Sequence, residues 1–293
     1  MAKSVKKKSV TAQPHVSEDT LEQIKKFHPV IANSNGKGGV GKTTFTSHEA
    51  WYCSEVLGLK TLVIDFDIDM HISKVFFGEE FDLSDYASSS DLFSNIEIAK
   101  PLLQHPDNEK LFFIPSDFDL EKIGNRDDED DVSVFPYFHV QSLRERFDII
   151  LIDCPPGKGQ YRNAGMLASN LTVLITEMSG ISFSAVSSAI KITDQMVSLL
   201  NEHNPDMQFQ YPAYLIVPNK FKGSRKEHRD ALSDLKASQL KISTELRDFG
   251  PIETSINVRR PVWTFKDGNA RSAAKNFKEV IINILSASVE VTK

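Results

Sequence analysis

Nearly continuous apolar runs alternate with amphipathic stretches along most of the chain. The apolar runs lie at 29–34 ("PVIANS"), 60–67 ("KTLVIDFD"), 110–116 ("KLFFIPS"), 147–154 ("FDIILIDC"), 171–176 ("LTVLIT") and 213–219 ("AYLIVPN"). Such runs are typical of strands with both faces covered, because a half-exposed strand alternates apolar and polar positions. Between them, helical spacing of apolar residues indicates helices at about 43–57, 90–104, 138–146, 182–202 and 225–247. This alternation predicts an α/β fold, a doubly wound and mostly parallel sheet with helices on both faces.

The segment before the first apolar run is mostly polar. We expect residues 1–28 to form a polar N-terminal tail, partly disordered, in which 17–27 ("SEDTLEQIKKF") folds as one short helix. Ser17 or Asp19 is the expected N-cap of that helix. The segment is too short to be a separate helix-turn-helix domain.

The last amphipathic stretch lies at about 270–286. Its apolar stripe consists of Ala273, Ala274, Phe277, Val280, Ile281, Ile284 and Leu285. We interpret the stripe as a core contact rather than a membrane-surface helix, since the "SASVEVTK" that follows has no cluster of lysines and bulky apolar residues. A single domain over 29–286 and a short C-terminal tail at 287–293 are therefore expected.

Composition narrows the class of protein. Of the 293 residues, 40% are hydrophobic and 25% are charged, which is ordinary for a globular protein. No run of 18 apolar residues occurs, and the basic N-terminus is not followed by the apolar stretch of a secretory signal. Cys53 and Cys154 are too far apart in sequence for a clustered metal site or a disulfide framework. These features favour a cytoplasmic protein without a membrane anchor.

The net charge of −6 conceals an asymmetry. Residues 219–278 hold 14 Lys and Arg against 7 Asp and Glu, a local +7, so the remainder carries −13. One interpretation is an ordinary solvated helix face, and the other is a basic surface for a polyanion such as DNA. The five consecutive acids at 127–131 are expected to form a solvated loop.

The segment "GKGGVGKT" (36–43) fits the G-x-x-x-x-G-K-[ST] pattern of a phosphate-binding loop, between an apolar strand and an amphipathic helix. Glycines let the backbone approach phosphates, and the N-terminus of the following helix adds partial positive charge. We expect Lys42 between the β- and γ-phosphates, Thr43 on Mg²⁺ and Thr44 near the α-phosphate. The expected nucleotide-binding residues are Gly36, Lys37, Gly38, Gly39, Val40, Gly41, Lys42, Thr43, Thr44 and Asn219.

In three further segments, an apolar strand has polar residues at its carboxyl end. "FDIILIDCPPG" ends in Asp153, and the Pro-Pro-Gly that follows turns the chain where a γ-phosphate sensor would lie. "VIDFDID" contains Asp65, Asp67 and Asp69, which share one side if the strand continues, although a solvated strand end is the alternative. "VPNKF" places Asn219 at a strand end, where an amide can both donate to and accept from an adenine edge.

The combination resembles the ParA/MinD family of deviant Walker A ATPases, most of all its ParA-type DNA partition members without an N-terminal helix-turn-helix domain. "KGGVGKTT" is similar to the family's loop, "DFDID" to its first switch and "DCPPG" to its second. "LFFIPSDFDLEKI" (111–123) and the basic stretch 255–281 match more loosely, so the resemblance spans about 29–286.

The resemblance implies a slow, Mg²⁺-dependent ATPase that forms a homodimer around two ATP molecules. It makes Lys37 a lysine that reaches the partner subunit's phosphates, and Lys42 the lysine that binds its own. Asp67 would orient or activate the attacking water. Thr43 would be the Mg²⁺ ligand, and Asp65 and Asp153 would support Mg²⁺ through water. Stabilisation of charge in trans makes hydrolysis depend on assembly.

The resemblance also implies nonspecific DNA binding, a ParB-like centromere-binding partner and association with the nucleoid. The candidate DNA contacts are Arg259, Arg260, Lys266, Arg271, Lys275 and Lys278. Partition members usually carry Asp-Pro-Gln after the first-switch acids, whereas "DIDMH" is closer to MinD. A MinD-like ATPase, or one that positions a conjugation complex or other cargo, acting on a membrane or a protein complex, is therefore the alternative. Neither cysteine forms the pair that iron–sulfur carriers with a similar loop require.

Overall fold

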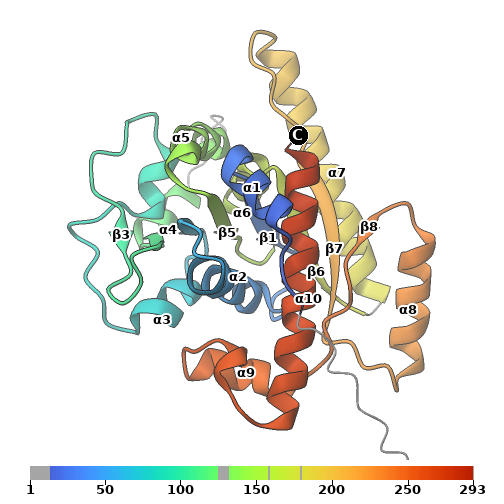
Figure 1. Ribbon diagram of the computed structural model, residues 1–293. Coiled ribbons are helices and arrows are strands. Elements are labelled where there is room, and N and C mark those ends of the chain that lie inside the picture. The colour runs from blue at the N-terminus through green and yellow to red at the C-terminus, as the bar shows by residue number, and fades with distance from the viewer. Residues whose placement is uncertain (1–13, 125–131, 158, 179, 293) are drawn as a thin grey trace, which may run out of the picture.

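The computed structural model describes residues 14–124, 132–157, 159–178 and 180–292 of the chain (Figure 1). The acidic run at 127–131 and most of the expected polar tail lie outside these ranges. Within the tail, helix α1 (Glu18–Phe27) forms with Ser17 as its N-cap, since the Ser17 side chain accepts a hydrogen bond from Thr20 N. Ile24 of α1 is fully buried, so this helix packs on the domain.

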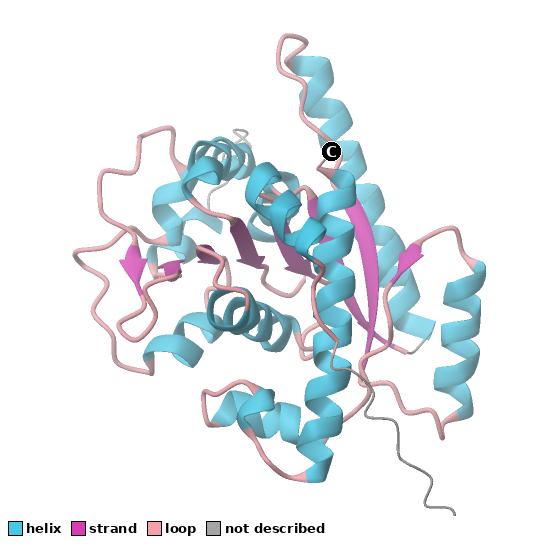
Figure 2. Ribbon diagram, viewed as in Figure 1, coloured by secondary structure: helices cyan, strands magenta, loops and turns pink. Residues whose placement is uncertain are grey.

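An eight-stranded sheet forms the centre of the molecule (Figure 2). Its strands are β1 (Val30–Ser34), β2 (Thr61–Asp65), β3 (Leu103–Gln104), β4 (Leu111–Ile114), β5 (Ile149–Asp153), β6 (Leu171–Glu177), β7 (Ala213–Asn219) and β8 (Lys241–Ile242). The spatial order is β3-β4-β2-β5-β1-β6-β7-β8, and only the pairing of β3 with β4 is antiparallel. The doubly wound, mostly parallel fold is confirmed.

Helices cover both faces of this sheet. They are α2 (Lys42–Trp51), α3 (His71–Phe77), α4 (Asp119–Gly124), α5 (Phe135–Leu143), α6 (Gln160–Ala168), α7 (Gly180–His203), α8 (Lys226–Ala237), α9 (Gly250–Asn257) and α10 (Gly268–Val291). Alternate residues of one strand enter different cores, because successive side chains point to opposite faces. Ile31 joins a cluster with residues of α1, α2 and α10, whereas Ala32 joins a cluster with residues of α4, α5 and α6.

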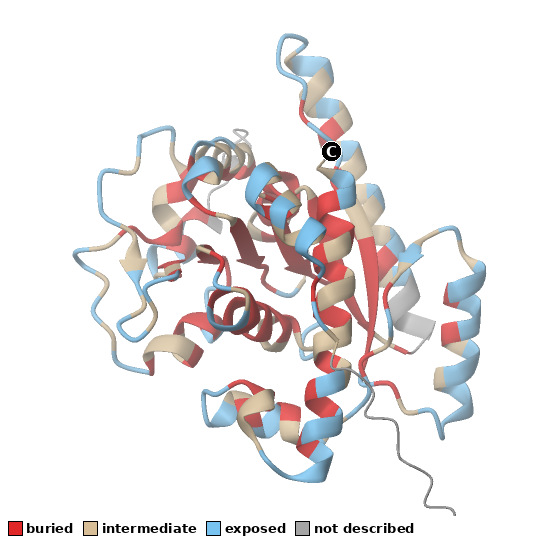
Figure 3. Cartoon of the chain, in the orientation of Figure 1, coloured by how far each residue is buried: buried red, intermediate tan, exposed pale blue. Residues whose placement is uncertain are grey.

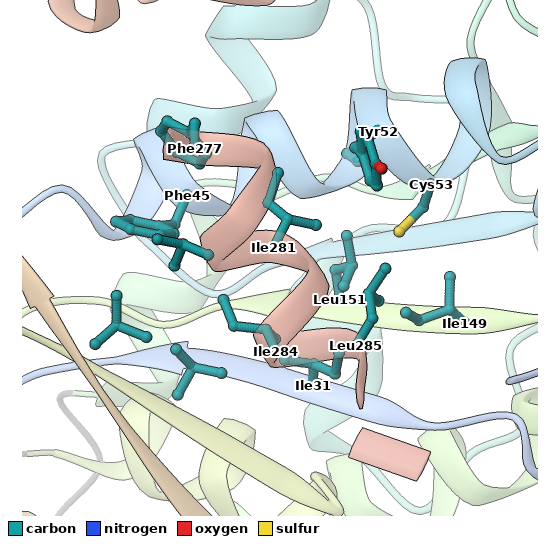
Figure 4. Close-up of a cluster of buried hydrophobic side chains, with 14 of the residues drawn as sticks. Ile31, Phe45, Tyr52, Cys53, Ile149, Leu151, Phe277, Ile281, Ile284 and Leu285 are labelled. Carbon is teal, nitrogen blue, oxygen red and sulfur yellow. The ribbon is translucent and has the colours of Figure 1, made fainter. Parts of the chain in front are cut away.

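Helix α10 lies along the sheet and against α2. In Figure 4, Ile281, Ile284 and Leu285 of α10 point toward the strands that carry Ile31 and Leu151. Phe277 packs against Phe45 of α2 with ring centroids 4.9 Å apart. Figure 3 shows the buried stripe along α10 and the fully buried central strands. The stripe predicted from the sequence is therefore a core contact, as interpreted.

Three predicted elements differ from the structure. The helix predicted at 90–104 is wrong: a short 3₁₀ helix (Ser89–Phe93) is followed by loop and β3, and Ile96 is 72% exposed instead of packing. The helix predicted at 225–247 ends at Ala237, because the chain then adds the edge strand β8 to β7. The final helix extends to Val291, so most of the expected C-terminal tail is helical.

Helices α3, α4, α6 and α9 were not predicted. All four are short, with 7, 6, 9 and 8 residues respectively, so they contain at most about two and a half turns of apolar periodicity. The helix predicted at 43–57 is present as α2, but it continues in a π-helical turn at Tyr52–Val56.

Candidate active site

The phosphate loop follows β1. The chain first adds strands on the β5 side of β1, with β2 to β5, and then on the β6 side, so the strand order changes side at β1. β1 lies between β5 and β6, and the chain leaves its carboxyl end toward α2. In open α/β sheets, ligands bind at this kind of switch point. The strand register brings Asp153 beside Asn33 on one side and beside Asp65 on the other. Three polar strand ends therefore meet beneath the loop.

Two glycines of the phosphate loop have the left-handed backbone conformation that glycine adopts more readily than other residues. Gly39 and Gly41 have φ angles of 73° and 98°, and α2 begins directly afterwards at Lys42. A Cβ atom at Gly41 would lie 2.6 Å from Asn219 Nδ2, so a side chain there would displace the end of β7. A pocket of about 390 Å³ lies over the loop, and its walls include Gly38, Gly39, Gly41, Lys42, Thr43, Thr44, Asp67 and Pro156.

Thr43 and Asp153 are already in contact. Thr43 Oγ1 donates a 2.7 Å hydrogen bond to Asp153 Oδ2, and Thr46 Oγ1 lies 3.0 Å from the other carboxylate oxygen. Lys42 is buried, and its Nζ is 3.5 Å from the carbonyl oxygen of Lys37. The sequence-predicted Lys42, Thr43 and Asp153 are thus brought together at one end of the pocket.

Three buried carboxyl groups lie around these strand ends. Burial, reinforced by the charge of Asp153, raises the pKa of Asp65 to about 8. Burial also raises the pKa of Asp153 to about 6, although hydrogen bonds from Thr43 and the charge of Lys42 act against it. Glu49, which accepts a hydrogen bond from Asn33, has its pKa raised by burial to about 8. A cation here would relieve this repulsion.

The residues present fit a magnesium ion. Thr43 offers a hydroxyl oxygen and Asp153 a carboxylate oxygen, the hard ligands that Mg²⁺ prefers. Asp65 is more enclosed than expected. Its carboxylate accepts hydrogen bonds from Asp67 N, Ser73 N and Ser73 Oγ, so it also holds the turn after β2 in place.

The expectation that Asp65, Asp67 and Asp69 share one side of a continuing strand is wrong, because β2 ends at Asp65. Asp67 lies in the turn, is 4% exposed and lines the phosphate pocket. Burial opposes ionisation of Asp67, but hydrogen bonds from His71 and Asp69 N together with the charge of Lys42 lower its pKa overall. Asp69 is exposed.

Sequence reasoning missed His71, which lies four residues after Asp67 and begins α3. Its Nδ1 is 3.3 Å from Asp67 Oδ2, and this contact raises the pKa of His71. One potential ligand atom from each of Asp67, Asp69 and His71 lies within 4.8 Å of the other two. The i, i+4 spacing of a carboxylate and an imidazole was the available signal.

Lys37 is turned away from the phosphate pocket of its own chain. Its Nζ donates to Glu177 Oε2 at 2.7 Å, and Lys37 is not among the residues that line the pocket. Glu177 also pairs with Lys220 Nζ at 3.2 Å, and Lys220 Nζ donates to Gly39 O at 2.7 Å. The two lysines lower the pKa of Glu177 although burial acts in the opposite direction. Glu177 and Lys220 were not identified from the sequence.

A second pocket, of about 260 Å³, adjoins the other side of the loop. Asn219 lines it, and its Nδ2 donates to Val40 O at 2.7 Å while its Oδ1 accepts from Lys220 N at 2.8 Å. Gly39, Gly41, Thr44 and Lys220 also line this pocket, and its remaining wall comes from the segment 246–257, through residues 246–250, 252, 253, 256 and 257. Sequence reasoning missed this wall. Its only local signal was the Gly-Pro pair at the start of α9.

The six candidate DNA contacts differ in their surroundings. Five of them are exposed, namely Arg259, Arg260, Lys266, Arg271 and Lys275. Arg259 has a φ of 54°, and a Cβ at Gly78 would lie 3.0 Å from its Nη1. Lys275 faces Glu279 at 4.0 Å. Lys278 is half-buried over the ring of Trp263, with its Nζ 5.4 Å from the centroid, and burial lowers its pKa.

Comparison with known protein families identifies an AAA domain over residues 28–208. The cell division protein PomZ of Myxococcus xanthus is 25% identical over 278 residues, which cover 88% of this chain and 80% of PomZ. The septum site-determining protein MinD of Thermotoga maritima is 27% identical over 266 residues, covering 89% of each protein. The chromosome-partitioning ATPase Soj of Treponema pallidum is 31% identical over 137 residues, 46% of this chain and 52% of Soj.

Solved structures share the fold. The ATP complex of an McdA variant from Cyanothece superposes with a TM-score of 0.71 at 21% identity, covering 88% of this chain and 96% of McdA. MinD from Pyrococcus horikoshii with Mg-ADP gives a TM-score of 0.62 at 20% identity, covering 87% and 95%. Among the described residues, no helix combines the length and apolar character needed to cross a bilayer.

Proposed function

The chain belongs to the AAA domain family of ParA/MinD-type P-loop ATPases, and from this premise we propose that it is a DNA-partition ATPase that switches by dimerising around ATP. The ATP-bound homodimer binds DNA nonspecifically, and a ParB-like centromere-binding protein stimulates slow hydrolysis and release. Solved relatives with Mg-ADP or ATP support the choice of a magnesium nucleotide as ligand.

One observation carries the proposal: the loop contains two lysines, but only Lys42 lines the pocket of its own chain. Lys37 is 47% exposed in its side chain and is held by Glu177 at the surface. An exposed ammonium beside a phosphate pocket is suited to the phosphates of a second copy. A charge supplied in trans couples hydrolysis to assembly, as an arginine finger does.

The other residues take roles that their surroundings support. Thr43 would hold Mg²⁺, Asp65 and Asp153 would support it through water, and the ion would neutralise charge on the phosphates. The pocket over the loop accepts the phosphates, with Thr44 at its wall. The pocket lined by Asn219 accepts the adenine, since Asn219 retains one amide hydrogen and one oxygen lone pair beyond its internal bonds.

Asp67 orients the attacking water. It faces the phosphate pocket, and its lowered pKa keeps it ionised at neutral pH. A carboxylate of low pKa is a weak base, so it serves better as an acceptor that positions water than as the final proton acceptor.

The strongest candidates for DNA contact are Arg259, Arg260, Lys266 and Arg271, which are exposed and, among the described residues, form no ion pair. The test is a gel shift with random duplex DNA in the presence of ADP, ATP or a slowly hydrolysed analogue, repeated over a range of salt. Binding that requires the triphosphate and falls steeply with salt is expected. DNA binding that is equally tight with ADP and with ATP would contradict a nucleotide-dependent switch.

The MinD and PomZ relatives favour a second candidate, a positioning ATPase for a membrane or protein cargo. It shares the nucleotide chemistry and differs only in the surface that the dimer presents. Sedimentation with anionic liposomes under the same nucleotide conditions separates the two. Liposome binding without DNA binding supports the second candidate, whereas the reverse supports partition.

A further inference from the structure

A buried arginine lies at the second switch, and none of the roles above uses it. Arg162 belongs to the first turn of α6 and is 2% exposed. Among the described residues, no carboxylate forms an ion pair with it. Its Nε is buried without a hydrogen-bond partner. An arginine in this condition is unusual, because a buried charge is ordinarily paired.

The hydrogen bonds of Arg162 place it at the junction of the two phosphate-facing loops. Its Nη1 donates to Gly157 O at 2.9 Å, and its Nη2 donates to Asn163 Oδ1 at 3.2 Å. Gly157 N in turn donates to Gly36 O at 3.1 Å. A Cβ at Gly36 would lie 3.7 Å from Arg162 Nη1. The guanidinium therefore lies near the start of the phosphate loop and is linked to it through the backbone of Gly157.

The helix that carries Arg162 does not compensate this positive charge, although Asp67 and Asp69 line the same cavity as Arg162. The N-terminal end of a helix carries partial positive charge and favours acids, yet the first turn of α6 contains none. Burial lowers the pKa of the Arg162 guanidinium, and arginine nevertheless stays protonated in proteins. Helix dipole and side chain thus act in the same direction, and both would be stabilised by an incoming anion.

A cavity connects this charge to the nucleotide. Arg162 lines a cavity of about 420 Å³ together with Asp67, Pro156 and Gln160. Asp67 and Pro156 also line the phosphate pocket, so the two spaces adjoin. Gln160 Oε1, like Arg162 Nε, is buried without a partner. Of these two atoms only the Arg162 Nε–H is a donor suited to an anion, because the amide oxygen of Gln160 accepts hydrogen bonds.

We propose that Arg162 is a positioning residue for the terminal phosphate of a nucleoside triphosphate, and that it makes the chain prefer ATP to ADP. The inference rests on the proposed function and deepens it. Arg162 holds the backbone of Gly157 beside the loop and supplies the positive charge that a third phosphate requires. A diphosphate, which lacks that phosphate, gains little from it.

Two substitutions separate the charge from the hydrogen bond. Arg162→Lys keeps the charge, whereas Arg162→Gln keeps a donor for Gly157 O and loses the charge. Affinities for Mg-ADP and for a slowly hydrolysed Mg-ATP analogue are measured by calorimetry, with thermal unfolding as the check on folding. We expect Arg162→Gln to weaken triphosphate binding at least about tenfold and to change diphosphate binding little, while Arg162→Lys keeps most of the preference.

Arg144 provides a matched control. It also donates to backbone carbonyls, those of Phe27 and His28, but it lies away from the loop. Arg144→Gln should leave the ratio of the two affinities unchanged. The inference is overturned if Arg162→Gln weakens both nucleotides equally, or if Arg162→Lys loses the preference as completely as Arg162→Gln. If the unmodified chain binds neither nucleotide, the proposed function itself fails.

Discussion

At the scale of single residues, two lysines of one loop have different surroundings. Lys42 is buried beneath the phosphate pocket, and Lys37 is held at the surface by Glu177. The sequence predicted both residues and the difference in their targets. It could not predict Glu177 or Lys220, because these residues reach the loop from β6 and β7, and no local pattern encodes that contact.

Substitution of the two lysines should therefore have different consequences. Lys42→Ala is expected to abolish ATP binding, because it removes the buried ammonium from the pocket. Lys37→Ala is expected to bind ATP normally and to lose hydrolysis by a factor of about 10³ or more, as for other charges supplied in trans. Equilibrium nucleotide binding and steady-state phosphate release measure the two effects. Normal turnover by Lys37→Ala would show that this lysine has no role in trans.

Asp67 is the second residue whose surroundings give a prediction. Its carboxylate lines the phosphate pocket and its pKa is lowered, mainly by His71 and despite burial. Asp67→Ala should retain ATP and accumulate as dimer, because water is no longer oriented while the phosphate contacts remain. Size-exclusion chromatography with ATP measures the dimer, and phosphate release measures turnover. Asp206→Ala, at an exposed position outside the pockets around the loop, is the control and should hydrolyse ATP as the unmodified chain does.

At the scale of elements, the six long apolar strands were predictable and the short connections were not. The sequence of a buried parallel strand contains a continuous apolar run. Such a run is present in β1, β2, β4, β5, β6 and β7. α9 has eight residues, and its pocket wall depends on packing against the loop after β1. The helix predicted at 90–104 failed because apolar spacing alone does not show whether a surface exists to bury it.

The packing of α10 on α2 is an element-scale contact with a measurable contribution. Phe277 is fully buried, 4.9 Å from the ring of Phe45 and 4.3 Å from that of His48. Phe277→Ala should lower the free energy of unfolding by about 3–5 kcal/mol. Ser272→Ala, on the exposed side of the same helix, should change it by less than about 0.5 kcal/mol. Chemical denaturation measures both free energies of unfolding. Equal effects of the two substitutions would show that the packing of Phe277 does not stabilise the fold.

At the scale of the whole molecule, buried titratable groups link stability to pH. The folded-state pKa of Glu49 and of Asp65 is about 8, above the unfolded value, because burial favours the neutral carboxyl. Their stabilisation is present at low pH and is lost as pH rises toward 8. Burial lowers the pKa of His48 to about 4, so its contribution rises with pH but is complete above about 6.5.

Between pH 6.5 and 8 Glu49 and Asp65 still titrate, and the raised pKa of His71 acts in the same direction, so the nucleotide-free chain should become less stable. The expected loss is roughly 1–2 kcal/mol for each of Glu49 and Asp65. Thermal unfolding at several pH values measures it. Mg-ADP should reduce the loss, since a cation beside Asp65 and Asp153 favours their ionised forms. Stability that rises across this window would contradict the buried-carboxyl account.

The hydrogen bond from Asn219 to the carbonyl of Val40 joins the rim of the base pocket to the curve of the phosphate loop. A displacement of Asn219 is therefore expected to displace the phosphate loop, and a displacement of the loop is expected to displace Asn219. The free energies of the two halves of the ligand should consequently not be additive: adenosine and tripolyphosphate, bound as separate molecules, should each help or hinder the other. Binding of the base and binding of the phosphates are then expected to be cooperative, although each takes place in a separate cavity.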